Sequence, residues 1–500
     1  MPTRITIVWL LTTALWAGGA AQAQVSDPIP QPVTTRGLSV EIRDLARLPD
    51  TQDMHPINDE SPSGYARVSF VRDAPDGRRF ANDSRGLLYL LGDNSEPSVY
   101  LNIAEVFPHA FYDSLQSGFI GFEFHPQFAD SGQLYTVHAE TAAGNPAQPH
   151  FIPPGFGPGD VNYHSVITEW QAVDPAAAAF EGDRREVLRV GHVVELFRHP
   201  LGYLGFNPTA EPGDAEYGLL YTGGNDLGFS NGGGPNAEDP AQLQRLDTVA
   251  GNIIRIDPRS PSESGGEPGA GDYTIPAINQ FAADNDPATL GEIYAAGFRN
   301  AHRLSWDMAD GTLFASDVGM SHVEEINIVH EGRNYGWMQR EGFFDNGTSV
   351  ADGAMREVHA LPVDILTGST QDGFTYPVAV YDHGEGQAVT AGFAYRGPIP
   401  ALQGKFVFGE LVRGRLFAAD VDAMKAADDG IPGTVAPVEE IQLFVRDAAG
   451  NRTDVTLWEL IEATLGTTIT RADLHISQGR NGEIFITSRQ DGMIRVLAGG

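Results

Sequence analysis

The stretch Gly311-Thr-Leu-Phe-Ala-Ser-Asp317 carries the pattern that decides the fold. A glycine, one further residue, Leu or Ile, and then Tyr or Phe recur along the chain at Gly86–Tyr89, Gly132–Tyr135, Gly218–Tyr221, Gly311–Phe314, Gly414–Phe417 and Gly482–Phe485. Each copy continues as a short β-prone run, which indicates a turn followed by a buried strand. We therefore expect an all-β protein, a six-bladed β-propeller in which each copy supplies one inner strand of a blade. The alternative is that the pattern is the common hairpin chemistry of any all-β fold.

Helical periodicity is scarce, and it predicts short helices only at Val421–Ala427 and Leu457–Leu465. The 58 Gly and 33 Pro residues mark loops between strands instead. The longest loops are expected at residues 142–161, 222–245 and 258–286, and loops of that size tend to carry function. A propeller must also close its ring, and we expect Leu38–Leu45 to pair with Met493–Leu497.

The first residues are typical of a secretory signal. Arg4 precedes a mostly apolar run, Ile5–Trp16, and small residues follow up to Ala21-Gln22-Ala23. The run is short for a membrane span and ends in a cleavage pattern, so we predict removal of residues 1–23, with an uncleaved anchor as the alternative. Residues 24–37 are predicted to form a Pro-rich leader, and residues 38–500 a single propeller. The mature protein is then expected in the periplasm or outside the cell.

Composition excludes several classes of function. The chain has no cysteine, so a disulfide scaffold, a thiolate metal site and a covalently attached c-type haem are ruled out. The formal net charge is -34, and Lys405 and Lys425 are the only lysines. Such a field repels nucleic acid and anionic membranes, so neither is an expected partner. We interpret most of the acidity as a solubilising surface.

One segment concentrates the polar groups that a ligand site needs. Between Gly297 and Gly342 the chain contains G-F-R-N-A-H-R, then D-V-G-M-S-H-V-E-E-I-N, then G-R-N-Y-G-W. Ordering so many polar groups is costly unless they hold something, and an anionic ligand with a metal ion fits their types. The pair Glu324-Glu325 is either a solvated turn or a support for such a metal.

Together with four other blocks, this segment resembles the glucose/sorbosone dehydrogenase family, which includes soluble quinoprotein glucose dehydrogenases and aldose sugar dehydrogenases. The resemblance runs from about Tyr65 to the C-terminus in several blocks in the same order. Besides the segment just described, they are Q-S-G-F-I-G-F-E-F-H-P-Q-F from Gln116, H-P-L-G-Y-L-G-F from His199, G-N-I-I-R-I-D-P from Gly251 and Y-D-H-G-E-G-Q-A-V-T-A-G-F-A-Y-R-G from Tyr381. The family fold is a six-bladed propeller.

The resemblance implies pyrroloquinoline quinone (PQQ) as cofactor, with a calcium ion (Ca2+) beside it. By position, the implied cofactor contacts are Gln116, Arg299, Asn300, Arg396, Arg413 and Arg415. The implied calcium ligands are the carbonyls of Gly319 and Met320, and the implied catalytic residues are His199 as base, Asp226 and Arg299. Arginine suits a tricarboxylate cofactor because it stays charged and meets carboxylates through a planar fork. We expect Arg299, Arg396 and His199 to share one electropositive cavity at the hub of an electronegative disc.

The implied reaction is oxidation of an aldose or related sugar to its lactone, with electrons passed to an external acceptor such as a cytochrome or a quinone. A neutral imidazole at His199 would take the hydroxyl proton while hydride leaves the same carbon. The alternative is a non-catalytic extracellular binding module that keeps the fold and a calcium site. Three departures bear on the substrate: Leu201 and Met338 stand where the family has Gly and Pro, and a one-residue shift would put Asn225 in the place of Asp226.

Overall fold

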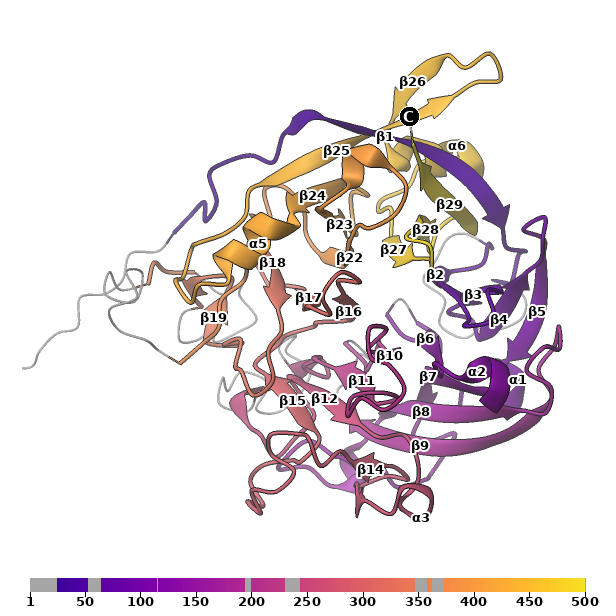
Figure 1. Ribbon diagram of the computed structural model, residues 1–500, viewed down its shortest axis with the longest axis vertical. Coiled ribbons are helices and arrows are strands. Elements are labelled where there is room, and N and C mark those ends of the chain that lie inside the picture. Colours follow the sequence, from indigo (N-terminus) through magenta and orange to yellow (C-terminus); the bar gives the residue numbers. More distant parts are fainter. Residues whose placement is uncertain are drawn as a thin grey trace, which may run out of the picture.

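The computed structural model describes residues 25–52, 64–114, 116–193, 199–229, 243–346, 358–361 and 373–499. Its antiparallel sheets stand around a common centre like the blades of a propeller (Figure 1). The predicted all-β propeller arrangement is therefore confirmed. The predicted signal sequence, residues 1–23, lies outside the described residues. Among the described residues, no helix is long and apolar enough to cross a membrane.

Four of the sheets are separate, four-stranded and antiparallel. The first consists of β2 (Val68–Asp73), β3 (Arg79–Asp83), β4 (Leu87–Leu91) and β5 (Pro97–Asn102). The second consists of β6 (Phe119–Phe124), β7 (Gln133–Thr141), β8 (Tyr163–Ala172) and β9 (Gly182–His192). The third consists of β10 (Gly205–Phe206), β11 (Leu220–Gly223), β12 (Asn252–Ile256) and β15 (Ile293–Ala296). The fourth consists of β16 (Arg303–Trp306), β17 (Leu313–Asp317), β18 (Val323–Ile328) and β21 (Ala379–Asp382).

The remaining large sheet has nine strands and contains two antiparallel runs. One run is β22 (Val389–Ala394), β23 (Lys405–Glu410), β24 (Leu416–Asp420) and β25 (Val438–Arg446), with β26 (Arg452–Val455) paired to β25. The other is β27 (Leu474–Gln478), β28 (Ile484–Ser488), β29 (Met493–Ala498) and β1 (Thr35–Arg47). A parallel pairing of β1 with β25 joins the two runs into one sheet. Six separate blades were predicted, whereas four stand alone and these two runs are fused at their outer strands.

The strands nearest the centre are the first of each run, namely β2, β6, β10, β16, β22 and β27 (Figure 1). The glycine-led repeats occupy other strands: β4, β7, β11, β17, β24 and β28, which are second or third in their runs. All six repeat glycines have positive φ, between 72° and 108°, which explains why glycine leads each copy. The repeat thus marks an interior strand of each run, which agrees with the predicted inner strand, and it does not mark the strand nearest the centre.

The helices are short and lie at the edges of the sheets. The two predicted helices are confirmed as α5 (Val421–Ala427) and α6 (Leu457–Leu465). Asp420 and Thr456 cap their N-termini by accepting backbone N–H groups. The other α-helices among the described residues are α1 (Ile103–Val106), α2 (Phe128–Ser131) and α3 (Pro261–Ser264). Two small hairpins, β13 (Glu267–Pro268) with β14 (Thr274–Ile275) and β19 (Arg340–Glu341) with β20 (Phe344–Asp345), lie in long loops.

The N-terminal strand closes the ring, as predicted. β1 pairs antiparallel with β29, and Ile42 stands opposite Leu497. The strand begins at Thr35, three residues before the expected start of the propeller. The preceding leader lies along the fourth sheet, because the amide of Val25 donates to the carbonyl of Val358 and that of Ile29 to Asp382. The N-terminal strand β1 and the C-terminal strand β29, which are far apart in the sequence, therefore pair within the nine-stranded sheet.

Replacing Ile42 with Ala tests this closure. The Ile42 side chain is buried in an aliphatic core with Val40, Ile441, Leu443 and Leu497. Removing it leaves a cavity, so we expect the free energy of unfolding in urea to fall by about 2–5 kcal/mol. The matched change Arg43→Ala, one residue away with 59% of its side chain exposed, is expected to change it by less than about 1 kcal/mol. Equal effects of the two changes would contradict the closing role of β1.

Candidate active site

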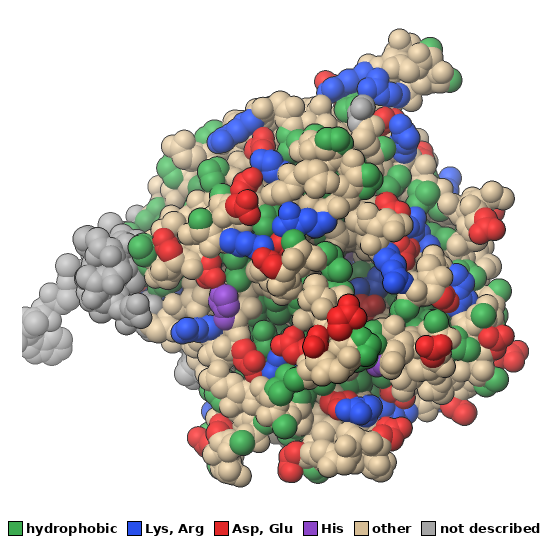
Figure 2. All heavy atoms as spheres, in the orientation of Figure 1, with side chains coloured by type: hydrophobic (Ala, Val, Ile, Leu, Met, Phe, Trp, Pro, Cys, Tyr) green, Lys and Arg blue, Asp and Glu red, His purple; other side chains and the backbone are tan. Residues whose placement is uncertain are grey.

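A cavity of about 140 Å³ lies at the centre of the ring. It is lined from several sheets and loops, and Gln116, His199 and Asn300 are among its walls. These three residues were predicted as site residues from separate blocks of the sequence. The structure brings them together around one space. In Figure 2 the molecule is hollowed near the middle of the visible face, and acidic side chains are spread over that face.

His199 and Asp226 form a buried pair beside this cavity. The Nδ1 atom of His199 lies 2.8 Å from Oδ1 of Asp226, and both side chains are almost wholly buried. The same carboxylate oxygen accepts the backbone N–H of Gly228 at 2.8 Å, which fixes its direction. A carboxylate at this position favours the tautomer with the proton on Nδ1, leaving Nε2 as an acceptor. The contact with Asp226 thus leaves Nε2 as the ring nitrogen that can accept a proton.

The one-residue ambiguity between Asn225 and Asp226 is settled by their contacts. Nδ2 of Asn225 donates to Oδ1 of Asn300 at 2.7 Å, whereas Asp226 contacts His199. The backbone amide of Asp226 also donates to the carbonyl of Arg299 at 2.7 Å. The acidic partner of the histidine is therefore Asp226.

Arg299 lies next to the cavity without lining it. Its Nη1 donates to the carbonyls of Val318 and Gly319, at 3.1 and 2.8 Å. Asp317 accepts the backbone amides of Arg299 and Asn300, at 3.0 and 2.6 Å, and so fixes the turn before β16. Because Asn300 reaches the cavity from this turn, Asp317 positions a cavity residue through the backbone.

The carbonyl of Gly319 does not fit a calcium ion in this arrangement, because it accepts a hydrogen bond from the cationic guanidinium of Arg299. Its turn is nevertheless rigidly held. Oε1 of Glu341 accepts the backbone N–H groups of Ser321, His322 and Val323, at 2.8, 2.7 and 3.1 Å. Within the described part of the chain, no group of three or more His, Asp or Glu side chains is arranged to hold a metal ion.

Glu324 and Glu325 are both buried, so the interpretation of this pair as a solvated turn is wrong. Oε1 of Glu324 lies 2.8 Å from Nε2 of His383, and its other oxygen accepts the amide of Val389 at 2.7 Å. Burial raises the pKa of Glu324 and of Glu325. Glu324 thus joins β18 to the start of β22, whereas Glu325 accepts from Nδ2 of Asn327 at 3.0 Å and from the amide of Gly342 at 2.9 Å.

Arg396 is not a cavity residue, and its predicted place beside His199 is wrong. It follows the end of β22 opposite to Ala388, which does line the cavity. The six residues of β22 separate the two ends by roughly 20 Å, given about 3.3 Å of rise per residue. The guanidinium pairs there with Asp307, with Nη2 2.6 Å from Oδ2, and Lys425 contacts the same carboxylate at 2.7 Å.

Arg413 and Arg415 also lie outside the cavity. Nη1 of Arg413 donates to the carbonyls of Gly384 and Glu385, at 3.1 and 3.2 Å. Arg415 pairs with Glu385 and Glu440, at 2.7 and 2.8 Å. The guanidinium of Arg413 is thus held by backbone carbonyls and that of Arg415 by carboxylates, and neither residue lines the cavity.

Other arginines line the cavity in their place. They are Arg303, Arg471 and Arg489, and two histidines, His302 and His475, accompany them. Arg303 belongs to the block G-F-R-N-A-H-R, but nothing in that block favours Arg303 over Arg299 as a cavity residue. Its position at the start of a central strand, β16, is what directs it inward. The prediction that Arg299, Arg396 and His199 share one cavity is therefore wrong, because only His199 lines it, and its arginines are accompanied by Asp473.

The two departures from the family pattern are buried away from the cavity. Leu201 packs in the core with Ile120 and Leu204, and its backbone amide donates to Ser165 at 3.2 Å. Met338 lies in the same core. Neither lines the cavity, so both act on the site through packing.

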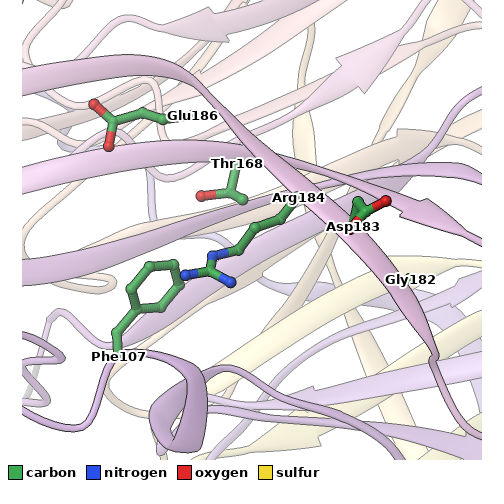
Figure 3. Close-up of a pocket in the computed structure, with 6 residues that line it drawn as sticks. All are labelled: Phe107, Thr168, Gly182, Asp183, Arg184 and Glu186. Carbon is green, nitrogen blue, oxygen red and sulfur yellow. The ribbon is translucent and has the colours of Figure 1, made fainter.

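A larger hollow, of about 470 Å³, lies away from the centre on β8 and β9 (Figure 3). The guanidinium of Arg184 stands 5.1 Å from the ring centre of Phe107 there. None of its lining residues was predicted as a site residue, and none forms a histidine–carboxylate pair like that of His199 and Asp226. We therefore take the smaller central cavity as the candidate site.

Comparison with known proteins agrees with the resemblance. The model of the family described as Glucose / Sorbosone dehydrogenase matches residues 217–447, which include Asp226, Arg299 and Asn300. Among curated proteins, the HIPL1 protein of Arabidopsis thaliana is 26% identical over 381 residues, which cover 67% of this chain and 50% of that protein. The chain spans about half the length of the curated relatives it matches.

Solved structures share the fold over nearly the whole chain. The soluble aldose sugar dehydrogenase of Escherichia coli, in its apo-form, has a TM-score of 0.53 at 15% identity, covering 92% of this chain and 99% of its own. The PQQ-bound aldose sugar dehydrogenase of Streptomyces coelicolor has a TM-score of 0.50 at 16% identity, with the same coverage of both chains. At such identity the likeness shows the fold alone. The predicted resemblance to the glucose/sorbosone dehydrogenase family is confirmed.

Replacing His302 with Asn tests the electrostatics of the cavity. Burial lowers the pKa of His302 to about 3, and the charges of Arg303, His199 and Arg489 lower it further, against the carbonyl of Asn300. Its unfolded pKa is about 6.5, so between these values the unfolded chain binds one more proton and stability rises with pH. From pH 5 to 6 we expect the free energy of unfolding of His302→Asn to rise by about 1.4 kcal/mol per pH unit less than that of wild type. Parallel stability curves in urea would contradict a neutral His302.

Proposed function

We propose that this protein is an oxidoreductase that uses PQQ to oxidise an aldose or related sugar at a CH–OH group. The observation that carries the proposal is the His199–Asp226 pair beside a central cavity that Gln116, Asn300 and arginines also line. The pair supplies a base, and the arginines supply positive charge in an otherwise acidic protein. Both are needed to oxidise a hydroxyl group with an anionic quinone.

The residues of the cavity fit an anionic, planar cofactor. Asn300 and Gln116 offer amide groups, and three guanidinium groups face the same space. Arg303 has a buried Nε atom without a hydrogen-bond partner, so the cavity has donor capacity to spare. Charge-assisted hydrogen bonds to carboxylates contribute about 1.5–3 kcal/mol each. Arg303, Arg471 and Arg489 would therefore hold such a cofactor.

The chain's own residues explain the proton movement. Asp226 fixes the imidazole of His199 with Nδ1 protonated, so Nε2 accepts the proton of the sugar hydroxyl. The resulting imidazolium is stabilised by the carboxylate that it already contacts. When bound, PQQ would supply the two-electron oxidant that takes hydride from the same carbon. The electrons must then leave to an external acceptor, since the chain has no cysteine for a c-type haem.

The number of blades and the division of the chain into segments belong to the same proposal. The two runs of the nine-stranded sheet count as two blades fused through β1 and β25, giving six blades in all. Each run has one glycine-led repeat strand, β24 or β28, like each of the four separate sheets. We keep residues 1–23 as a cleaved signal, residues 24–37 as a leader and residues 38–500 as one propeller, which places the enzyme in the periplasm or outside the cell.

One observation favours the alternative, a binding module without redox chemistry. Arg396, Arg413 and Arg415, which the resemblance assigns to the cofactor, are engaged by acidic or carbonyl partners elsewhere. In addition, the Gly319 carbonyl is occupied by Arg299. A propeller that had lost the cofactor would be expected to engage these arginines and the Gly319 carbonyl in internal contacts. It would, however, have no need of the His199–Asp226 pair.

Reconstitution separates the two functions. The purified protein is mixed with PQQ and calcium, and the quinone absorbance and the reduction of a dye are followed with a panel of aldoses. The proposal predicts micromolar or tighter binding of the quinone and bleaching of the dye by at least one sugar. Binding without turnover of any sugar favours the module, and absence of binding refutes the use of the quinone.

Substitutions of His199 and of Asp226 test whether His199 acts as the base. In the reconstituted enzyme, His199→Ala is expected to lower kcat by about 10²–10⁴-fold while quinone affinity changes little, because a positioned base contributes that factor. Asp226→Asn is expected to lower kcat as well, since the amide no longer selects the tautomer with Nε2 free. Steady-state kinetics at saturating quinone measure both effects. Undiminished kcat in His199→Ala refutes the assignment.

Calcium at Gly319 and Met320 stays a prediction, and it requires Arg299 to release the Gly319 carbonyl. In the protein without quinone we therefore expect weak calcium binding, because the guanidinium occupies the place of the ion. Arg299→Met removes that charge and is expected to tighten calcium binding, as measured by calorimetric titration. Tight binding to wild type, weakened by Arg299→Met, would contradict this competition.

A further inference from the structure

The backbone at the His199–Asp226 pair adopts a conformation that side chains oppose. His199 has a φ of 47°, and Leu227, which follows Asp226, has a φ of 56°. In this left-handed region Cβ comes close to the backbone, so residues other than glycine are seldom found there. Such a conformation persists only where the surrounding contacts hold it in place. The contacts that hold these two loops therefore decide how the pair is kept together.

A buried serine hydroxyl holds the loop that carries His199. The backbone amide of Leu201 donates to Oγ of Ser165 at 3.2 Å. Ser165 lies in β8, and both residues are fully buried. Because a buried amide without an acceptor is unfavourable, this bond fixes the backbone two residues after His199.

The same hydroxyl contacts a second buried residue, His192, at the end of β9. Nε2 of His192 lies 2.9 Å from Oγ of Ser165. The strands β8 and β9 are antiparallel neighbours (Figure 1), and Tyr163 stands opposite His192, so Ser165 is the diagonal neighbour of His192 on one face of the sheet. Since the hydroxyl oxygen accepts the Leu201 amide, its hydrogen is left to donate to Nε2.

His192 also lies beside the loop that carries Asp226. Burial lowers the pKa of His192 to about 3, and the charge of His164 adds to the effect. The backbone of Leu227 and the carboxylate of Asp226 act on this pKa in the opposite direction, so the ring is close to both. The imidazole is therefore neutral near pH 7, which leaves one ring nitrogen to accept the serine hydrogen.

We propose that Ser165 and His192 are positioning residues of the His199–Asp226 pair. The chain of hydrogen bonds from the Leu201 amide through the serine to His192 ties the loop of the histidine to the sheet beside the loop of the aspartate. Nδ1 of His199 is thereby kept within hydrogen-bonding distance of Asp226. The inference rests on the proposed function and deepens it, because neither positioning residue lines the cavity or belongs to the blocks that carry the resemblance.

The test uses Ser165→Ala, with Ser477→Ala as the matched control. Oγ of Ser477 in β27 likewise accepts a buried amide from another sheet, that of Val71 in β2, at 3.1 Å. Both changes leave one buried amide without its acceptor, so we expect similar losses of stability in urea. His192→Leu and His192→Gln complete the set, since leucine removes the contact with the serine and glutamine keeps an acceptor near the place of Nε2.

The first readout is the tautomer of His199, which needs neither quinone nor sugar. NMR spectra of protein labelled with isotopic histidine report the ring nitrogens, and the His199 signals are identified by their loss in His199→Ala. In wild type, Ser477→Ala and His192→Gln we expect the tautomer with the proton on Nδ1. In Ser165→Ala and His192→Leu we expect a mixture of both tautomers, because the ring no longer stays at a fixed distance from Asp226.

The second readout is the kinetics of the reconstituted enzyme. Ser165→Ala and His192→Leu are each expected to lower kcat by about tenfold to a hundredfold, with little change in KM or PQQ affinity, because a base displaced by about 1 Å loses much of its effect. Ser477→Ala should keep the kcat of wild type. Since the two positioning residues act through one chain of hydrogen bonds, the double variant should lose no more than either single variant.

A purely structural role of Ser165 predicts a different pattern. Ser165→Ala would then lose stability as Ser477→Ala does, while the tautomer of His199 and kcat stay as in wild type. That result overturns the proposal. It is also overturned if wild type already shows both tautomers, or if the losses of kcat multiply in the double variant.

Failure of the proposed function would be seen separately. If wild type binds no quinone or oxidises no sugar, the redox assignment fails, and the tautomer of His199 alone decides on the positioning role. A mixture of tautomers in Ser165→Ala still supports that role, and an unchanged spectrum overturns it.

Discussion

The structure depends on the burial of positive charge at the centre of a protein whose formal net charge is -34. Arg67, Arg303 and Arg489 are all buried there, within reach of one another's charge. Taking such groups out of water is expensive, and Arg67 offsets part of that cost through its ion pair with Asp113. A propeller tolerates this arrangement because its central strands come from different sheets, so that each sheet brings one or two polar groups to the hub while its other strands pack an apolar core.

The same geometry explains why the base and the cations share one space. His199 reaches the cavity from the loop before β10, Asn300 from the turn before β16, and Gln116 from the loop before β6. Buried carboxylates hold these loops from behind: Asp226 holds His199, and Asp317 holds the amides of Arg299 and Asn300. Loop residues and strand residues therefore line the site together, and buried carboxylates position two of the loop residues, His199 and Asn300.

Much of the fold could be predicted from the sequence, because strand and helix signals are local. The repeat gave the strands after positive-φ glycines, the two helices were located correctly, and β1 closes the ring with β29. Asn300 and His199, which the sequence predicted as site residues, line the central cavity, and their roles there stay predictions. Arg396, Arg413 and Arg415 were misplaced because a long side chain follows its nearest carboxylate, and Asp307, Glu385 and Glu440 come from distant parts of the chain. Arg303 and Arg489 were missed for a different reason: they are far apart in the sequence, and only the packing of the sheets brings both to one cavity.

The most direct test of the account is a crystal structure of the protein with PQQ bound. The account predicts the quinone in the central cavity, with a carboxylate on the Arg303–Arg489 side and a ring face open to a sugar whose hydroxyl group reaches Nε2 of His199. A quinone bound instead at Arg413 and Arg415, or absent from the cavity at saturating concentration, would contradict it.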